Sequence, residues 1–442
     1  METEERIEKM LKLNKLFRDG MILQRDVPVR IWGEADAPVT VSVDMHSAAD
    51  FIRDGKFSLT LPPHKAGGPY TMFVECGGEV TKIYDVYFGD VFLAGGQSNM
   101  AMTLGDLSQP LEACDYPVRM FTTDREWEYS RRPETDERWV EISEENKQGI
   151  SATASHFAIS LANKVKVPVG ILNCNQGASV IRAWLSPEAT EKEAIFSPDT
   201  KWHPDADSDD FPFNKTNYLY LERLQHLHPY NIKGVIWYQG ESDSYKTMAH
   251  KYRDLFEILV RDWRNKWLYD ELPFVLVQLA PYNADEDEWF YVVRECQMMA
   301  AETIPNVGTI SIGDVGDFND IHPRDKKTVG ERLALHARGM IYGEDILYRS
   351  PMCRSASFDG KTIILSFSDV GEGLYETDEL KFCVKDTDGN VTDVSYEICG
   401  DTVRLNCENV TPVEVLFCFD NGSAVSLFSS AKLPVMPFRM KI

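Results

Sequence analysis

Between Gly89 and Tyr342, short apolar runs alternate with longer stretches in which apolar residues recur at helical spacing. Five such runs occur: VFLA at 91–94, VGILN at 169–173, GVIWY at 234–238, FVLVQL at 274–279 and VGTISI at 307–312. A continuous apolar strand is typically buried on both faces, and an intervening helix allows the next strand to pair in parallel. The pattern therefore predicts an α/β core, with a parallel sheet of about five strands between helices.

The chain on either side of this core has strand-type patterns without helical periodicity. VPVRIWG and FSLTLP before it, and TIILSFS and VRLNC after it, show alternation of period two and are separated by turn pairs such as Asp-Gly. Such runs at this spacing are typical of antiparallel sheets. We therefore expect three parts: an N-terminal β-sandwich over 1–87, the α/β core over 88–345 and a C-terminal β-module over 346–442.

Charge and composition exclude several classes of partner. The formal net charge of −24 repels nucleic acid and anionic lipid surfaces, so neither is expected to bind. No run approaches the roughly 20 apolar residues of a membrane-spanning helix. Residues 1–10, METEERIEKM, contain no basic region followed by an apolar one, which predicts a cytoplasmic location, although a trimmed secreted chain would look the same.

The cysteines and histidines do not have the spacing of a disulfide framework or a metal site. The nine cysteines are scattered and form no C-x-x-C pair, and the histidines form no H-x-x-x-H or H-E-x-x-H pair. We therefore expect buried free thiols, as in a reducing compartment, and no metal.

Residues suited to catalysis follow four of the five predicted strands. Ser98 follows the first strand, Gly177 the second, Gln239 the third and His322 the fifth. Ligands of an open parallel sheet bind beyond the carboxyl ends of its strands, so these four residues are predicted to meet at one edge. Taken singly, each is more typical of a helix cap, a turn or a loop; their joint placement indicates a site.

These residue types suit acyl transfer. A serine hydroxyl becomes nucleophilic when a neighbouring base takes its proton, and a neutral histidine does this near pH 7. The oxyanion of the tetrahedral intermediate needs preorganised donors. The backbone N–H groups of Ser98 and Gly177 and the side-chain amide of Gln239 are candidates for that role.

With the motifs GDVFLAGGQSNM, NIKGVIWYQGESD and NDIHPRDKKTVGERLA, the chain resembles the sialate O-acetylesterase branch of the SGNH (GDSL-like) hydrolases, which includes acetylxylan-esterase relatives. The resemblance runs from LFRDGMILQRDVPVRIWG to LPVMPFR and covers almost the whole chain. It implies a flavodoxin-like SGNH core carrying β-modules, and hydrolysis of O-acetyl esters of sugars without a cofactor. Ser98 matches the nucleophile, His322 the base, and Gly177 and Gln239 the remaining oxyanion donors.

The substrate implied by the resemblance is an acetylated mono- or oligosaccharide. A sialic acid O-acetyl ester is the first expectation, and acetylated xylan is the alternative. A non-catalytic carbohydrate-binding protein, in which the β-modules bind sugar and the core is inactive, is the competing hypothesis from another class.

The sequence departs from the family pattern at the acid of the triad. The wider superfamily has an aspartate three residues before the histidine, where this chain has Asn319. Asp320 is our candidate for orienting His322, with Asp317 or a backbone carbonyl as alternatives. The run Gly177-Ala178-Ser179 also replaces the Gly-Gly-Thr of many relatives, which indicates a different pocket shape near the acyl group.

Glu241 and Asp243 suggest another chemistry, the paired carboxylates of a glycosidase. Residues two apart on one loop rarely flank a glycosidic bond, and five βα units are too few for an eight-unit barrel. We expect Glu241 instead to form hydrogen bonds within its loop and to hold Gln239, with contact to substrate as the second possibility.

Two further interpretations concern the sugar itself. Arg294, on the helix after the fourth strand, either binds an anionic sugar carboxylate or lies on an ordinary helix surface. Trp184, Trp237 and Tyr238 either form a wall on which a sugar stacks or pack in the core, and core packing is favoured for Trp237.

Overall fold

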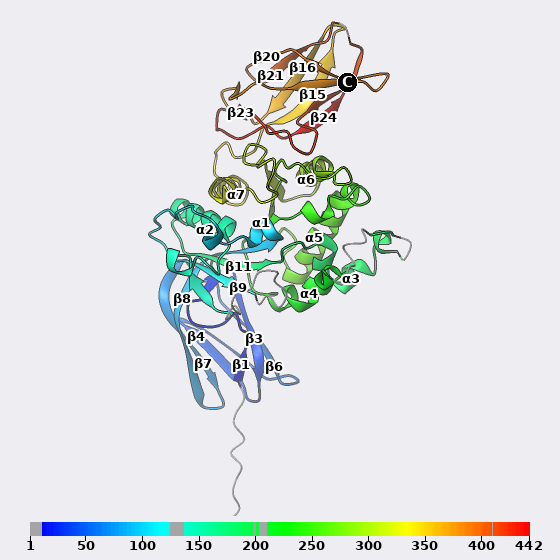
Figure 1. The fold of residues 1–442 in the computed structure, drawn as a ribbon. Coiled ribbons are helices and arrows are strands. Elements are labelled where there is room, and N and C mark those ends of the chain that lie inside the picture. The colour runs from blue at the N-terminus through cyan, green and yellow to red at the C-terminus, as the bar shows by residue number, and fades with distance from the viewer. Residues whose placement is uncertain (1–10, 124–136, 198–199, 203–209, 409) are drawn as a thin grey trace, which may run out of the picture.

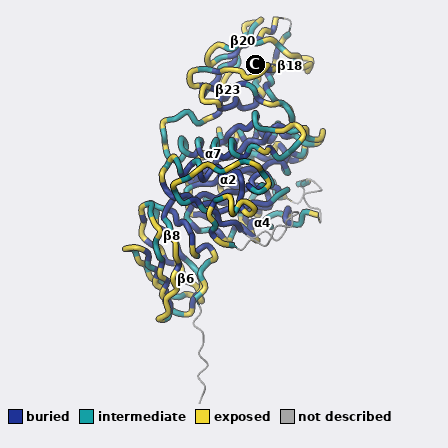
Figure 2. The backbone as a smooth tube through the Cα atoms, turned by 60° about the vertical axis from the view of Figure 1, so that its left-hand side comes forward, coloured by how far each residue is buried: buried dark blue, intermediate teal, exposed yellow. Residues whose placement is uncertain are grey.

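The computed structural model describes residues 11–123, 137–197, 200–202, 210–408 and 410–442. Figure 1 shows three parts stacked along one direction: N-terminal sheets in blue, a mixed core in cyan, green and olive-yellow, and C-terminal sheets in yellow-orange to red. Figure 2 shows that buried backbone is concentrated inside the middle part. In the described ranges, no helix is long and apolar enough to cross a membrane. Residues 1–10, on which the expected location rests, lie outside these ranges.

The N-terminal part consists of two sheets that share a core. One contains β1 (Leu11–Leu13), β3 (Val29–Ala35) and β6 (Lys56–Leu61), all antiparallel. The other contains β4 (Val39–Val43), β5 (His46–Asp50), β7 (Gly67–Cys76), β2 (Ile22–Gln24) and the first half of β8 (Glu79–Gly96). Exposed and buried residues alternate along β6, as its sequence predicts.

The central sheet begins where β8 continues without interruption past residue 87. Its order is β10-β9-β11-β8-β12-β13-β14. The strands that join β8 are β9 (Val118–Thr122), β10 (Trp139–Glu141), β11 (Val169–Asn175), β12 (Gly234–Tyr238), β13 (Phe274–Val277) and β14 (Val307–Ile310). All pairs are parallel except β10 with β9.

The predicted α/β fold is confirmed. Numbered along the chain, the five predicted strands lie in the order second, first, third, fourth, fifth, which is the flavodoxin-like order. The first strand, β8, adjoins the point where the strand order reverses. In doubly wound folds this is the place where ligands bind, beyond the carboxyl ends of the strands.

Helices cover both faces of the sheet (Figure 1). Alternate residues of β12 face opposite sides: Val235 and Trp237 belong to one hydrophobic cluster, and Ile236 and Tyr238 to another. The first cluster includes residues of α5 (Tyr252–Trp267) and α6 (Phe290–Thr303), and the second residues of α2 (Ala152–Val165) and α7 (Lys326–Met340). Short helices α1 (Ser98–Ala101), α3 (Pro187–Thr190) and α4 (Tyr218–Glu222) complete the core.

The C-terminal part has a hydrophobic cluster of its own, which includes Leu365, Phe382, Val403 and Phe417. Its sheets are antiparallel, in the orders β15-β16-β21-β20, β19-β18-β22-β24 and β17-β23. The bounds are β15 (Met352–Phe358), β16 (Thr362–Ser368), β17 (Leu374–Glu376), β18 (Phe382–Asp386), β19 (Val391–Val394), β20 (Tyr396–Cys399), β21 (Thr402–Asn406), β22 (Pro412–Phe417), β23 (Leu427–Ser429) and β24 (Phe438–Lys441).

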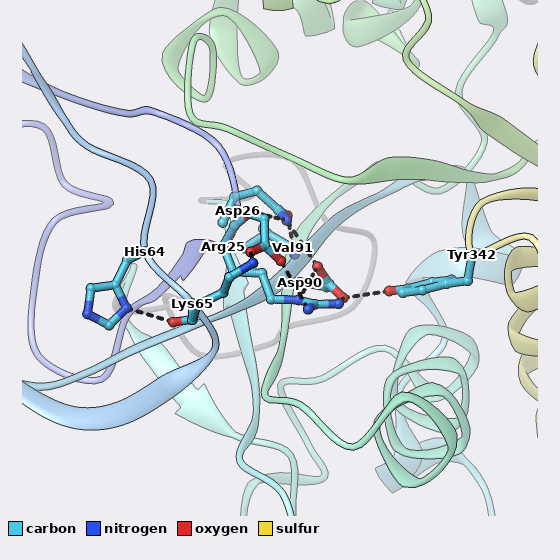
Figure 3. A network of polar contacts seen from close by, with 8 residues as sticks. Arg25, Asp26, His64, Lys65, Asp90, Val91 and Tyr342 are labelled. Atoms are coloured by element: carbon cyan, nitrogen blue, oxygen red, sulfur yellow. Dashed lines mark hydrogen bonds and ion pairs between the residues drawn. The ribbon is translucent and has the colours of Figure 1, made fainter.

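A buried carboxylate connects the N-terminal part to the core (Figure 3). Asp90, fully buried in β8, accepts hydrogen bonds from Arg25 Nε (3.0 Å) and Nη2 (2.9 Å), from Gln24 Nε2 (3.0 Å) and from Tyr342 Oη (2.7 Å). A buried charge is tolerated when it is paired and fully hydrogen-bonded. The network therefore fixes the N-terminal segment to the strand that leads into the site.

The cysteines are all free, and they differ in exposure. Cys76, Cys174, Cys296 and Cys407 are buried, whereas Cys399 is exposed and the other four are intermediate. The expectation of burial therefore holds for four of the nine thiols.

Candidate active site

A sharp turn at the end of β8 presents Ser98. Gly96 has φ of +135°, and a Cβ at this position would lie 2.0 Å from the Tyr238 carbonyl oxygen. Only glycine fits this close approach to the neighbouring strand. The chain then starts α1 at Ser98, which is half-buried between the buried residues Gln97 and Asn99.

The structure brings Ser98 and His322 together. His322 lies in the loop between β14 and α7, 224 positions further along the chain, and its Nε2 is 2.9 Å from Ser98 Oγ. Burial lowers the pKa of His322 below its ordinary value, and the positive charge of Lys326 acts in the same direction. A neutral imidazole at hydrogen-bond distance can accept the serine proton near pH 7.

Asp320 lies on the other side of the imidazole. Its Oδ1 is 3.7 Å from His322 Nδ1 and accepts a hydrogen bond from the His322 backbone N–H at 2.9 Å. A distance of 3.7 Å is too long for a hydrogen bond to the ring, so Asp320 acts on it through charge. Asp317, the alternative acid, accepts a hydrogen bond from the Asn319 N–H (2.9 Å) within its own turn.

We predict that Asp320→Asn lowers kcat by about ten- to a hundredfold with little change in melting temperature. Loss of the carboxylate of a buried triad aspartate lowers kcat by about 10⁴-fold. We expect a smaller effect here because Asp320 is more than a third exposed and its Oδ1 is 3.7 Å from the imidazole Nδ1. Steady-state kinetics and thermal denaturation check this, with Asp317→Asn as the matched control. A near-normal rate in Asp320→Asn would transfer the orienting role to Asp317 or a backbone carbonyl.

Gly177 borders the nucleophile at the end of β11. A Cβ at Gly177 would lie 3.7 Å from Ser98 Cβ, so the backbone of this turn adjoins the serine. The first N–H groups of a helix have no partner within the helix, and the Ser98 N–H is the first of α1. Two of the three residues predicted to supply oxyanion donors, Ser98 and Gly177, thus lie next to each other.

The structure corrects the third donor. Gln239 is fully buried; its Nε2 donates to the Ser179 carbonyl (3.0 Å) and to Asp243 Oδ2 (2.6 Å), and its Oε1 accepts from Tyr252 Oη (3.0 Å). Both amide hydrogens are therefore occupied within the protein. The buried Asp243 carboxylate needs donors, and it engages the amide that sequence position alone suggested for the oxyanion.

Glu241 also differs from expectation. It lies in the 3₁₀ turn Glu241–Asp243, and its Oε1 accepts a hydrogen bond from Asn99 Nδ2 at 2.5 Å. Asp243, not Glu241, holds Gln239. Both acids are at least 95% buried, so neither the glycosidase pair nor a direct contact of Glu241 with substrate is supported.

Arg294 is neither a surface residue nor open to a substrate carboxylate. It is 1% exposed on α6, and its Nη2 donates to the carbonyl of Asp420 in the C-terminal part. Burial lowers its pKa to about 10, which leaves the guanidinium charged at neutral pH. Its place in the fold is the contact between α6 and the C-terminal β-module.

The aromatic residues considered for sugar stacking belong to the core. Trp184, Trp237 and Tyr238 are all fully buried, and the two indole rings meet edge to face at 6.1 Å. The interpretation as a sugar-stacking wall is therefore wrong for all three.

Three polar residues of the site were not predicted from the sequence. Gln97 Oε1 accepts hydrogen bonds from the backbone N–H groups of Gly240 (3.3 Å) and Ser242 (3.2 Å). Asn99 and Lys326 are buried, and Asn99 Nδ2 donates to the carbonyl of Ile321, the residue before His322. The only signal for Gln97 and Asn99 was that they flank Ser98, and none distinguished Lys326 from the adjacent Lys327.

The arrangement brings together a serine hydroxyl and an imidazole at hydrogen-bond distance, an acid beside the imidazole, and a glycine turn next to the serine, which are groups that serine-dependent acyl transfer uses. Within the described ranges, no three side chains of histidine, cysteine, aspartate or glutamate are grouped to hold a metal ion.

The chain is similar to known carbohydrate esterases. Residues 88–338 match the family model described as carbohydrate esterase, sialic acid-specific acetylesterase. Sialate O-acetylesterase of Homo sapiens is 28% identical over 388 residues (76% of this chain, 72% of the relative), and that of Mus musculus is 27% identical over 400 residues (75% and 74%).

A solved structure is similar over nearly the full length. XAC1771, a carbohydrate acetylesterase from Xanthomonas citri, is 32% identical, with a TM-score of 0.86 over 98% of this chain and 99% of that one. The matched residues, 88–338, make up more than half of the sequence, and Ser98, Gly177 and His322 lie within this range. The chain therefore belongs to the sialic acid-specific acetylesterase family, and it is a carbohydrate esterase that acts on acetylated sugars.

Proposed function

We propose that this enzyme removes O-acetyl groups from sialic acids, with Ser98 as nucleophile and His322 as general base. The 2.9 Å separation of Ser98 Oγ and His322 Nε2 is the observation that carries the mechanism. The choice of sugar is supported by the family model and by the mammalian relatives, which are named for sialate.

The reaction follows from the positions of these groups. Ser98 Oγ attacks the acetyl carbonyl carbon while His322 Nε2 takes the hydroxyl proton, and the N–H groups of Ser98 and Gly177 stabilise the oxyanion. The intermediate collapses when the sugar oxygen leaves and takes the proton from His322, and Ser98 remains acetylated. Water, deprotonated by His322, then attacks the acetyl carbonyl, and acetate departs as His322 returns the proton to Ser98 Oγ.

An anionic sugar needs a cation at the site, and Arg324 is our candidate. Arg324 is exposed and lies two residues after His322, and its positive charge contributes to the lowered pKa of the imidazole. Its Nη1 donates to the Asp106 carbonyl at 3.2 Å, which holds the side chain beside the catalytic loop. The buried Arg294 cannot take this role.

We predict a preference for O-acetylated sialic acids over acetylated xylo-oligosaccharides of at least about tenfold in kcat/KM, measured as acetate release. Arg324→Gln should raise KM for the sialate ester about tenfold, as expected for one charge-assisted hydrogen bond, and leave hydrolysis of p-nitrophenyl acetate on the pH plateau unchanged. Faster turnover of the xylo-oligosaccharide would overturn the sialate assignment while leaving the esterase mechanism intact.

A further inference from the structure

A buried hydrogen-bond network connects the neighbours of both catalytic residues. Asn99, the residue after Ser98, donates through Nδ2 to Glu241 Oε1 (2.5 Å) and to the carbonyl of Ile321 (3.0 Å), the residue before His322. Its Oδ1 accepts a hydrogen bond from Lys326 Nζ at 2.5 Å. One amide thus joins the nucleophile turn, the loop after β12, the catalytic loop and the start of α7.

The network is unusual because its ionisable members are almost fully buried. Lys326 has no exposed surface and Glu241 is 5% exposed. Lysine and glutamate are rarely buried unless they are paired, because removing a charge from water is costly. Glu241 Oε2 has no hydrogen-bond partner in the described part of the chain, so the carboxylate depends on Asn99 and on the charge of Lys326.

We propose that Asn99, held between Lys326 and Glu241, is a positioning residue that fixes the His322 loop against the Ser98 turn. The inference rests on the proposed function, since it assigns the network to the reaction of that pair. The hydrogen bond from Asn99 to the Ile321 carbonyl fixes the backbone next to His322. Asn99 itself follows Ser98 directly in the chain, so its position is also tied to that of the nucleophile. Without this bridge Ser98 and His322 are still present, but the distance between Ser98 Oγ and His322 Nε2 is less tightly fixed. Reaction rates are sensitive to misplacement of about 1 Å.

Lys326 also acts on the base through its charge. A positive charge near an imidazole disfavours protonation, so it keeps His322 in the form that accepts the serine proton. Burial lowers the pKa of Lys326 to about 7, against the attraction of its acidic neighbours, and burial raises the pKa of Glu241. The charged groups that act on His322 are Lys326, Asp320 and Arg324, and those that act on Lys326 are Glu241, Asp320 and Asp325.

Lys326→Met tests the inference. Methionine retains much of the apolar stem of lysine, but it removes the positive charge and the hydrogen bond that Lys326 Nζ donates to Asn99 Oδ1. With p-nitrophenyl acetate we expect kcat on the pH plateau to fall about tenfold, with KM changed less than twofold. The acid limb of kcat/KM should move to higher pH by about half a unit, because His322 protonates more readily without the neighbouring cation. A purely structural role would not move the acid limb.

Lys327→Met is the matched control: this lysine pairs with Glu112 at the surface (2.8 Å), and its replacement should change neither quantity. If Lys326→Met does not fold, Glu241→Gln is the second test. Glutamine keeps an acceptor for Asn99 and removes the negative charge that favours protonated Lys326. Lys326 is then less often charged and His322 protonates more readily, so the acid limb should again move to higher pH.

Two outcomes overturn the inference: a wild-type rate and acid limb in the variant that folds, or an equal change in Lys327→Met. Failure of the proposed function gives a different result, because Ser98→Ala would then retain turnover. Inactive Ser98→Ala together with unchanged Lys326→Met refutes the network alone.

Discussion

Ser98→Ala is expected to lower kcat for acetyl ester hydrolysis by at least about 10⁴-fold. Without Oγ no acetyl-enzyme forms, and the remaining backbone donors and His322 support only slow direct attack by water. Alanine removes one oxygen from a half-buried position, so the fold should be unaffected. Release of p-nitrophenol and of acetate from an acetylated sugar measures the loss, and thermal denaturation measures stability.

Ser108→Ala is the matched control, since Ser108 is an exposed serine ten residues further along the chain. It should behave as wild type in both assays. Intact-mass measurement during turnover adds a direct readout: an acetyl adduct is expected on wild type and not on Ser98→Ala. Turnover within tenfold of wild type in Ser98→Ala would refute Ser98 as the nucleophile, and sugar binding without hydrolysis by either protein would favour the non-catalytic hypothesis.

The central sheet was predictable because its strands are nearly continuous apolar runs, the sequence signature of strands buried on both faces. The predicted strands also allowed Ser98, Gly177 and His322 to be placed near one another. The carboxyl ends of parallel strands lie at the same edge of the sheet, whatever their separation in sequence. The strand β9 (Val118–Thr122) was not predicted. Its VRMFT sequence includes an arginine, and its edge partner β10 follows only after residues 123–138.

The fate of individual polar side chains at the strand ends was not predictable. A sequence gives the position of Gln239 after β12 but not the buried Asp243 that binds its amide. It likewise gives two adjacent lysines, and only the helix phase at the start of α7 decides that Lys326 is buried and Lys327 is not. Such choices depend on partners from distant segments, which a single sequence without its fold does not specify.

The C-terminal β-module contacts the loop that carries the base. The Val425 N–H donates to the Gly313 carbonyl (2.9 Å), and the Tyr282 N–H donates to the Asn421 carbonyl (2.9 Å). The adjacent Asn283 N–H in turn donates to the Phe318 carbonyl (2.9 Å), four residues before His322. The C-terminal module therefore supports the segment between β14 and α7 through backbone hydrogen bonds. The bond from the buried Arg294 to the Asp420 carbonyl belongs to the same interface.

His322→Asn is expected to lower kcat by about 10³- to 10⁴-fold with KM changed little, because the proton of Ser98 then has no acceptor of suitable basicity. Burial and the positive charge of Lys326 lower the pKa of His322 below its ordinary value, which favours the neutral base near pH 7. As pH falls through that pKa, kcat/KM should drop tenfold per unit, and His322→Asn should lack this limb. His250→Asn, at an exposed histidine, is the control and should retain the wild-type profile. Rates of p-nitrophenyl acetate hydrolysis between pH 4.5 and 8 provide the measurement. An acid limb that persists in His322→Asn would assign the titration to another group and remove His322 from the reaction.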